Sequence, residues 1–488
     1  MTGRTTTMHP SPLRLYIGGH WLDDASGGRR PVVNPATGAP IGELPLAGPA
    51  EIDAAADSAA RGFAAWRRVL PVERCAVLQR AAALMRERAE SMAAGLTAEQ
   101  GKPFAEALRE VRLSADILDF QAEEAKRLYG RTVPPRVAGI LSHTVSPQPI
   151  GPVAAFTAWN FPVNLPTRKL AAALAAGCSV VLKPAEETPA SAMRLVECLL
   201  AAGLPAEAVQ LVCGRPAEVS QRLIAHPAIA KVSLTGSVAV GRLLAEQCAR
   251  EGKAFAGELG GHAPVIVCAD ADVDAVLKLA VPAKFRNAGQ VCASPIRFYV
   301  ARALVERFVG GLVGAANALR LGPGDDPATQ MGPLAHAGRV DDMQRFVDDA
   351  RACGARVACG GARVDRPGFF FAPTVITDAP PHSRVMQIEP FGPIAVVAPF
   401  DTLDEAIAQA NALPYALAAY AFTRDIDTAH RLGDELDAGM VGINHFGVSQ
   451  PELPFGGRKA SGEGVEMGAE GILAYTVMKA VTVGTAAV

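Results

Sequence analysis

The chain has 488 residues, of which 50% are hydrophobic and 20% charged, and its formal net charge is −2. This composition is typical of a folded chain with several domains and excludes an intrinsically disordered one. The near-zero net charge supplies no bulk attraction to nucleic acid or to an anionic membrane surface, so neither is an expected partner.

Targeting and metal-binding signals are absent from the sequence. The N-terminal stretch MTGRTTTMHPSPLRLYIGG has no apolar core of the length that a signal peptide needs. The longest apolar-leaning run, at 170–182, is interrupted by Gly177, whereas a membrane-spanning helix needs about 20 apolar residues. We therefore expect a cytoplasmic protein. The nine cysteines form no CxxC motif and the nine histidines no HExxH motif, so we expect reduced thiols and no bound metal.

Residues 50–128 carry apolar side chains at three- and four-residue spacing, which predicts helices, with Gly101 and Pro103 ending one of them. From residue 150 to about 250, short apolar strands alternate with helices in the order βαβαβαβα. That order predicts a doubly wound parallel sheet, whose ligands bind beyond the carboxyl ends of the strands. The predicted strands are 152–156, 179–184, 208–214 and 230–236.

A second α/β stretch begins near residue 255, with helices predicted at about 272–286, 303–319 and 402–411. Two further strands, 143–150 and 474–485, belong to neither predicted sheet. They suggest a small third unit of the kind that pairs between subunits. The strands predicted for the second sheet are 264–268, 297–301, 373–377, 394–400 and 420–423.

Polar residues follow three strands of the first predicted sheet. The amide of Asn160 could donate to an oxyanion, or it could cap the next helix. Lys183 and Glu186 stand at the ligand-binding edge, where a carboxylate can accept from both ribose hydroxyls, although a solvated loop fits equally well. Gly236 begins a loop that opens a helix and could bind a pyrophosphate, but no GxGxxG motif occurs and a plain glycine turn is the alternative.

Two more residues are candidates for covalent and acid–base chemistry. Glu258 precedes a Gly-Gly pair, and if it is buried its raised pKa would suit a general base, although it could also lie on an exposed turn. Cys292 lies in the stretch AKFRNAGQVCASPIRFYV at 283–300. Its neighbours alone do not distinguish it from the other eight cysteines as a nucleophile.

Taken together, these stretches resemble the aldehyde dehydrogenase superfamily over nearly the whole chain. The resemblance implies an α/β fold with two doubly wound parallel-sheet domains and a small β oligomerisation arm. It implies an NAD(P)-binding domain of atypical Rossmann type at 1–123 and 145–254, a catalytic domain at 255–455, and oligomerisation strands at 124–144 and 472–488, in a homodimer or homotetramer. The motifs are NPATG (34–38), WNFP (159–162), KPAE (183–186), TGS (235–237), ELGG (258–261), FRNAGQVC (285–292), EPFGP (389–393) and PFGG (454–457).

The resemblance also implies residue roles. Cys292 is the nucleophile, Glu258 the general base, and Asn160 forms an oxyanion hole with the backbone N–H of Cys292. Family members that transfer the acyl group to coenzyme A lack the glutamate, so its presence favours hydrolysis. A non-catalytic binding or structural relative would have lost one of these three residues, which are all present. The implied cofactor-binding residues are Trp159, Lys183, Glu186, Gly236, Ser237, Glu389 and Phe391.

The positions expected to line the substrate tunnel are polar. Arg168, Arg286 and Ser449, with Phe455 beside them, are similar to the carboxylate-binding set of succinate semialdehyde dehydrogenases, although either arginine could instead form a structural ion pair. We expect the substrate to be a short aldehyde with a terminal carboxylate, and succinate semialdehyde is the first choice. The alternatives are 2-oxoglutarate semialdehyde and a broader aldehyde specificity.

Two positions refine this expectation. Some succinate semialdehyde dehydrogenases carry a second cysteine two residues after the nucleophile and use the pair as a redox switch. Ser294 stands at that position here, so this switch is not available. Glu186 would repel a 2′-phosphate, which favours NAD over NADP as the cofactor, with NADP still possible.

Overall fold

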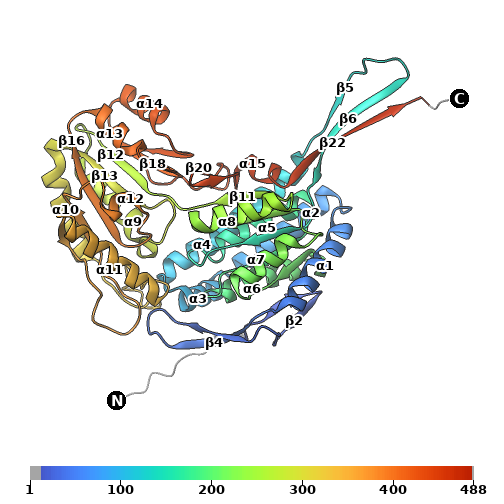
Figure 1. Ribbon diagram of the computed structural model, residues 1–488, viewed down its shortest axis with the longest axis horizontal. Helices are drawn as coiled ribbons and strands as arrows, with labels where there is room; N and C mark the ends of the chain where they lie inside the picture. Colours follow the sequence, from blue (N-terminus) through green and yellow to red (C-terminus); the bar gives the residue numbers. More distant parts are fainter. Residues whose placement is uncertain (1–11, 486–488) are drawn as a thin grey trace.

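The computed structural model describes residues 12–485, so the first eleven residues of the expected 1–123 segment and the last three of the expected 472–488 segment lie outside the described residues. Figure 1 shows two lobes, each built around a sheet with helices packed on it, and a narrow arm that extends away from them. Both large sheets are mainly parallel, which confirms the predicted α/β architecture. No helix within residues 12–485 is long and apolar enough to cross a membrane.

The first sheet has eight strands in the order β2-β1-β9-β8-β7-β10-β11-β21. Its central strands β7–β11 are parallel, and their side chains are mostly buried, as expected for a sheet covered by helices on both faces. Chain order reverses where β7 pairs with β10, which creates a crevice at the carboxyl ends of these strands. The strands are β1 (Leu15–Ile17), β2 (His20–Leu22), β7 (Val153–Phe156), β8 (Val180–Lys183), β9 (Val209–Leu211), β10 (Lys231–Thr235), β11 (Ala254–Glu258) and β21 (Gly462–Glu463), and the connecting helices are α5 (Asn164–Ala176), α6 (Pro189–Ala201), α7 (Pro216–Ala225) and α8 (Val238–Arg250).

Strand β11 extends the first sheet past residue 254, where the boundary between the two large domains is expected. It pairs in parallel with β10 from Ala254 to Glu258, so the first sheet continues into the segment that was assigned to the catalytic domain. The short strand β21 then pairs with β11 from the C-terminal part of the chain, and the N-terminal strand β1 pairs with β9 at the opposite side. Backbone pairing between segments so distant in sequence leaves no periodic signal in either segment.

The second sheet has seven strands in the order β14-β15-β16-β13-β12-β18-β19, and all but β14 run parallel. Helices α11 and α14 were not predicted; α11 is the helix that reaches the candidate site described below. The strands are β12 (Ala263–Val267), β13 (Pro295–Ala301), β14 (Arg356–Cys359), β15 (Thr374–Thr377), β16 (Ile394–Phe400), β18 (Ala418–Phe422) and β19 (Met440–Ile443), and the helices are α9 (Val273–Phe285), α10 (Val305–Ala318), α11 (Ala337–Ala352), α12 (Arg384–Gln387), α13 (Leu403–Asn411) and α14 (Ile426–Glu435).

The arm is an antiparallel sheet in the order β22-β6-β5 (Figure 1). Strand β6 (Ile140–Pro149) runs through the expected boundary between residues 144 and 145. The other arm strands are β5 (Arg131–Val133) and β22 (Thr476–Gly484). The remaining elements are β3 (Arg29–Val33), β4 (Pro40–Pro45), β17 (Tyr415–Ala416), β20 (Arg458–Lys459), α1 (Pro49–Trp66), α2 (Pro71–Glu87), α3 (Ala89–Gln100), α4 (Phe104–Glu124) and α15 (Gly468–Leu473).

Candidate active site

The candidate site lies where the carboxyl ends of the first sheet meet the amino ends of the second. Asn160 follows β7 and Glu258 is the last residue of β11. Cys292 and Glu389 lie on loops that lead into β13 and β16 of the second sheet. Parallel strands present all their ends of one kind at one edge, so each sheet contributes several loops to the same interface.

Cys292 is half-buried at this interface. Burial raises the pKa of its thiol to about 11, and the positive charge of Arg168 opposes this rise. The carboxylates of Glu389 and Glu258 add to it. Three charged side chains from separate parts of the sequence therefore lie close enough to act on this one thiol. Since only a thiolate is strongly nucleophilic, a neighbouring group must take the proton of Cys292 before it attacks.

Glu258 is buried, and its Oε2 atom has no hydrogen-bond partner in the part of the chain that the structure describes. Burial and the nearby carboxyl of Glu466 raise the pKa of Glu258 well above its ordinary value, while Lys169 and Arg168 act in the opposite direction. The ammonium of Lys169 is itself bonded to Glu466, and it also donates to Ser233 Oγ at 3.1 Å. A carboxyl with a raised pKa and a free oxygen is suited to exchange protons near neutral pH.

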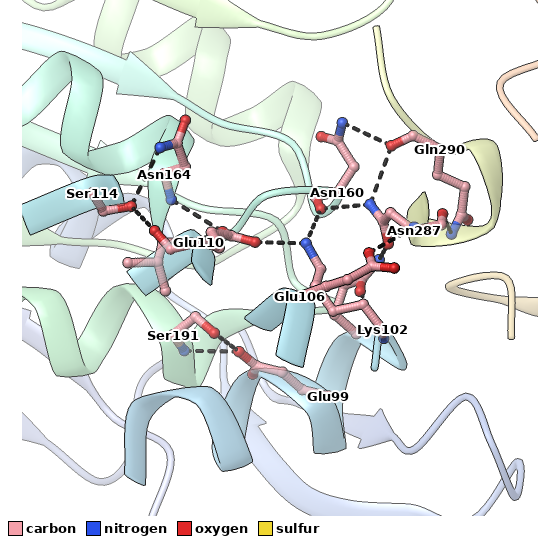
Figure 2. Close-up of polar contacts among 12 residues, drawn as sticks. Glu99, Lys102, Glu106, Glu110, Ser114, Asn160, Asn164, Ser191, Asn287 and Gln290 are labelled. Carbon is pink, nitrogen blue, oxygen red and sulfur yellow. Dashed lines mark hydrogen bonds and ion pairs between the residues drawn. The ribbon is translucent and has the colours of Figure 1, made fainter. Parts of the chain in front are cut away.

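Asn160 is held by contacts to both its amide and its backbone (Figure 2). Its side-chain Nδ2 donates to the carbonyl of Gln290, 3.1 Å away on the loop that carries Cys292. Its backbone carbonyl accepts from Lys102 Nζ at 2.7 Å and from Asn287 Nδ2 at 2.9 Å. These bonds fix the predicted oxyanion donor against the cysteine loop.

Lys102 is the centre of this polar cluster. Its side chain is 1% exposed and forms an ion pair of 2.5 Å with Glu110. The second carboxylate oxygen of Glu110 accepts from the backbone N–H groups of Val163 and Asn164 at the start of α5. Figure 2 shows Asn164 beside this carboxylate. Sequence analysis missed this pair because charged residues next to a turn or on a helix are usually solvent-exposed. The only signal was the turn that Gly101 and Pro103 form around Lys102.

Three of the four predicted substrate-binding residues come together. Arg168 Nη2 donates to Ser449 Oγ at 3.0 Å, and its guanidinium carbon lies 4.2 Å from the centroid of the Phe455 ring. Asn164 accepts from Arg168 Nε at 2.7 Å, which fixes the direction of the guanidinium. Arg168 is buried, and its Nη1 lies 3.9 Å from Glu466 Oε2, at the limit of an ion pair. The side chain therefore has donors that these partners do not fully use.

The fourth, Arg286, stands apart from this group. Within residues 12–485, no hydrogen bond joins it to Arg168 or Ser449, and its guanidinium carbon lies 5.9 Å from the ring centroid of Phe161. Burial raises the pKa of Tyr420, and both Arg286 and Cys292 also act electrostatically on that phenol. Arg286 and Cys292 thus both lie near Tyr420, but Arg286 does not join the group around Arg168.

The residues predicted to bind a dinucleotide follow β8 and β10. Lys183 Nζ and Glu186 Oε1 form a buried ion pair of 2.6 Å. Ser237 caps α8, because its Oγ accepts from the backbone N–H of Val240 at 3.3 Å, and Gly236 precedes it. The N-terminus of α8 lies beside the crevice where β7 pairs with β10, and a helix N-terminus offers free N–H groups to a phosphate. These residues therefore fit a dinucleotide.

The second half of the predicted cofactor site lies on the loop before β16. Glu389 is half-buried, burial of its carboxyl raises its pKa to about 8, and its buried Oε1 has no hydrogen-bond partner among residues 12–485. Phe391 has a left-handed φ of 48°, and Trp159 packs edge-on against it with the ring centroids 5.5 Å apart. A carboxylate with one buried, unused oxygen fits the hydroxyl groups of a ribose. Within residues 12–485 no cluster of three or more His, Cys, Asp or Glu side chains could hold a metal ion.

Comparisons with known proteins identify the family of the chain. The model of the aldehyde dehydrogenase family matches residues 21–481. The chain is 49% identical to 4-(hydroxymethyl)benzenesulfonate dehydrogenase TsaD1 of Comamonas testosteroni over 96% of this chain and 98% of that protein. It is 43% identical to the NADP+ succinate-semialdehyde dehydrogenase GabD of Escherichia coli K12, over 96% of this chain and 98% of that protein. An aldehyde dehydrogenase structure from Bacillus cereus in complex with NAD+ superposes with a TM-score of 0.95 at 33% identity, covering 98% and 97% of the two chains.

Proposed function

This chain belongs to the aldehyde dehydrogenase family and is an NAD(P)-dependent aldehyde dehydrogenase, and from this premise we propose that it oxidises a short aldehyde with an anionic group at its far end. Succinate semialdehyde, oxidised to succinate, is the first candidate. The observation that supports this choice most directly is the buried guanidinium of Arg168, which acts on the Cys292 thiol and bonds to Ser449. A positive charge fixed beside a nucleophile favours a substrate whose tail is negative.

We assign the chemical steps to the residues around Cys292. The thiolate of Cys292 attacks the aldehyde carbon to form a thiohemiacetal, whose oxyanion accepts from the Asn160 amide and the Cys292 backbone N–H. NAD(P)+, when bound, supplies the hydride acceptor for this reaction. Loss of hydride leaves a thioester on Cys292. Glu258 then takes a proton from water, and the hydroxide attacks the thioester. Cleavage of the C–S bond releases the free acid and the Cys292 thiolate, and Glu258 loses its proton to solvent.

We assign cofactor binding to the loops that follow β7, β8 and β10 and to the loop before β16. Lys183 and Glu186 hold the adenosine ribose, Ser237 with Gly236 meets the pyrophosphate, and Trp159, Glu389 and Phe391 position the nicotinamide end. The carboxylate of Glu186 disfavours a 2′-phosphate, which supports NAD as the preferred cofactor.

Other anionic aldehydes are candidates for the same site. 2-Oxoglutarate semialdehyde differs from succinate semialdehyde by an added keto-bearing carbon and fits the same charges. A sulfonated aldehyde is favoured by a separate observation, because a relative that is 49% identical is named for a benzenesulfonate. A guanidinium presents the same fork of donors to a sulfonate as to a carboxylate.

A substrate panel tests this proposal. We would compare kcat/KM for succinate semialdehyde, 2-oxoglutarate semialdehyde, 4-formylbenzenesulfonate and butanal, each with NAD and with NADP. In Arg286→Ala we expect kcat/KM for the anionic substrates to fall about 10- to 100-fold, which corresponds to one lost charged hydrogen bond, while the value for butanal changes little.

The control is Arg307→Ala, which removes an exposed arginine paired with Asp274 and is expected to leave every value unchanged. Butanal oxidised as efficiently as the anionic substrates by the wild-type enzyme would contradict an anion-selective site. An equal loss for butanal and the anions in Arg286→Ala would show that Arg286 does not bind the charged group. A clear preference for NADP would contradict the assigned effect of Glu186.

We also propose that the arm joins two copies of the chain into a homodimer or homotetramer. Strand β22 is at the edge of its three-stranded sheet, and Val477, Val481 and Val483, at alternate positions, are between 41% and 47% exposed. A free strand edge that bears exposed valines is a surface that another strand can cover.

We expect Val477→Glu combined with Val481→Glu to lower the molecular mass measured by sedimentation, since buried unpaired carboxylates oppose association. Ile426→Glu changes an exposed apolar residue on α14, away from the arm, and should leave the mass unchanged. A wild-type protein that sediments as a monomer at micromolar concentration would contradict the proposal.

A further inference from the structure

The loop before β16 contains a backbone conformation that its neighbours must hold in place. Phe391 has φ of 48°, in the left-handed region, where a residue with a side chain is disfavoured relative to glycine. It lies between Glu389 and the strand, on the side of the site assigned above to the nicotinamide. Residues in such conformations persist only when surrounding contacts over-determine them.

The main contacts come from one arginine in the first turn of α11. Arg339 Nη2 donates to the backbone carbonyls of Pro390 and Phe391, the latter at 3.1 Å. Its guanidinium carbon lies 5.9 Å from the centroid of the Phe391 ring, and its side chain is 16% exposed. Its Nη1 donates to Asp342 on the same helix, which fixes the plane of the guanidinium. One charged group thus bonds to two successive carbonyls of the loop.

Two other residues bring the same helix against the same loop. His336, immediately before α11, packs edge-on against Trp159 at 5.7 Å, and Trp159 in turn packs against Phe391. Farther along the helix, a methyl group added to Gly392 would come within 2.2 Å of Met343 Sδ, so the backbone of the loop rests directly on the helix. Arg339 also acts electrostatically on the carboxyl of the half-buried Glu389.

We infer that Arg339 is a positioning residue that holds the loop from Glu389 to Phe391 in the conformation that receives the nicotinamide end of the cofactor. This inference rests on the cofactor-binding roles proposed above for Glu389 and Phe391. Arg339 has no contact with Cys292, Glu258 or Asn160 among the interactions of residues 12–485. Its loss should therefore impair hydride transfer and cofactor binding while leaving the thiol chemistry intact.

Hydrolysis of 4-nitrophenyl acetate separates these two functions, because it needs no cofactor. The Cys292 thiolate displaces 4-nitrophenolate and becomes acetylated, and water then hydrolyses the thioester to acetate and the free thiol. Aldehyde oxidation uses the same thiol but also requires hydride transfer. A variant defective only in the cofactor loop should therefore lose aldehyde oxidation and retain ester hydrolysis.

In Arg339→Met we expect kcat for aldehyde oxidation to fall and KM for NAD to rise, each about 10- to 100-fold, because a reacting group displaced by about 1 Å loses a comparable factor. Ester hydrolysis and KM for the aldehyde should stay within about 2-fold of wild type. Arg339→Lys should recover part of the loss, since an ammonium can reach one carbonyl but cannot form the fork.

The matched control is Arg345→Met. Arg345 also pairs with Asp342 on α11, but it is 64% exposed and does not contact the loop. We expect Arg345→Met to leave both activities unchanged. If Arg339 acted only by balancing the charge of Asp342, Arg339→Met and Arg345→Met would give the same result.

Parallel loss of ester hydrolysis and aldehyde oxidation in Arg339→Met would overturn the inference, because it would indicate a general structural defect. Unchanged aldehyde oxidation in that variant would overturn it equally. A failure of the proposed function itself would look different: the wild-type protein would hydrolyse the ester without oxidising any aldehyde of the panel, and the inference would fail with it.

Discussion

Replacement of Cys292 by alanine is expected to lower kcat for aldehyde-dependent NADH formation by about 10⁴-fold or more, since removal of a nucleophile leaves only the surrounding binding and oxyanion groups. Arg168, Glu258 and Glu389 all act electrostatically on this thiol, which is therefore at the centre of the charged groups of the site. The measurement is the initial rate at which absorbance at 340 nm increases as NADH forms, at saturating aldehyde and cofactor.

Cys353→Ala is the matched control for this experiment. Cys353 is also half-buried, but it caps the end of α11 and lies in none of the predicted site loops. Its replacement should leave the rate unchanged. Thermal unfolding of both variants should stay close to wild type, so that a lost rate reflects lost chemistry. More than a tenth of the wild-type rate in Cys292→Ala would contradict the assignment of the nucleophile.

Glu258→Gln is expected to separate the two halves of the reaction. Glutamine keeps the shape of the side chain but cannot accept a proton from water, so the thioester should accumulate. We expect a burst of about one NADH per active site, followed by a steady-state rate lower by about 10²- to 10⁴-fold. Intact mass spectrometry of the quenched enzyme should show the acyl group on Cys292.

The pH dependence gives a second readout for this residue. Burial and Glu466 raise the pKa of Glu258, so its carboxylate fraction grows only as the pH rises through that raised value. The wild-type hydrolysis step should therefore accelerate with pH over this range, and Glu258→Gln should lose the dependence. Glu463→Gln, an exposed residue on the neighbouring strand β21, should retain it. Absence of both burst and adduct would indicate that Glu258 acts before the thioester forms.

Much of the fold could be predicted because its signals are local. Buried runs such as Val153–Phe156 and Ile394–Phe400, each followed or preceded by an amphipathic helix, specify parallel strands from a short window of sequence. Asn160 and Glu258 lie next to strands of the first sheet, so their meeting at its carboxyl edge follows from the strand order. Cys292 precedes a strand of the second sheet and meets them only because the two sheets pack together. Their chemical roles came from the resemblance and stay predictions until the variants are measured.

The sequence alone thus determined the alternation of strands and helices and the motifs that border them, because the spacing of apolar residues within a short window differs between a strand and a helix. The tertiary structure alone decided that Lys102 and Glu110 form a buried pair behind Asn160, that β11 belongs to the first sheet, and that Arg339 reaches the loop of Phe391. Each of these contacts depends on which distant surfaces pack together. A charged side chain that is buried and paired has the same local sequence as one that faces water, and only the packed structure distinguishes the two.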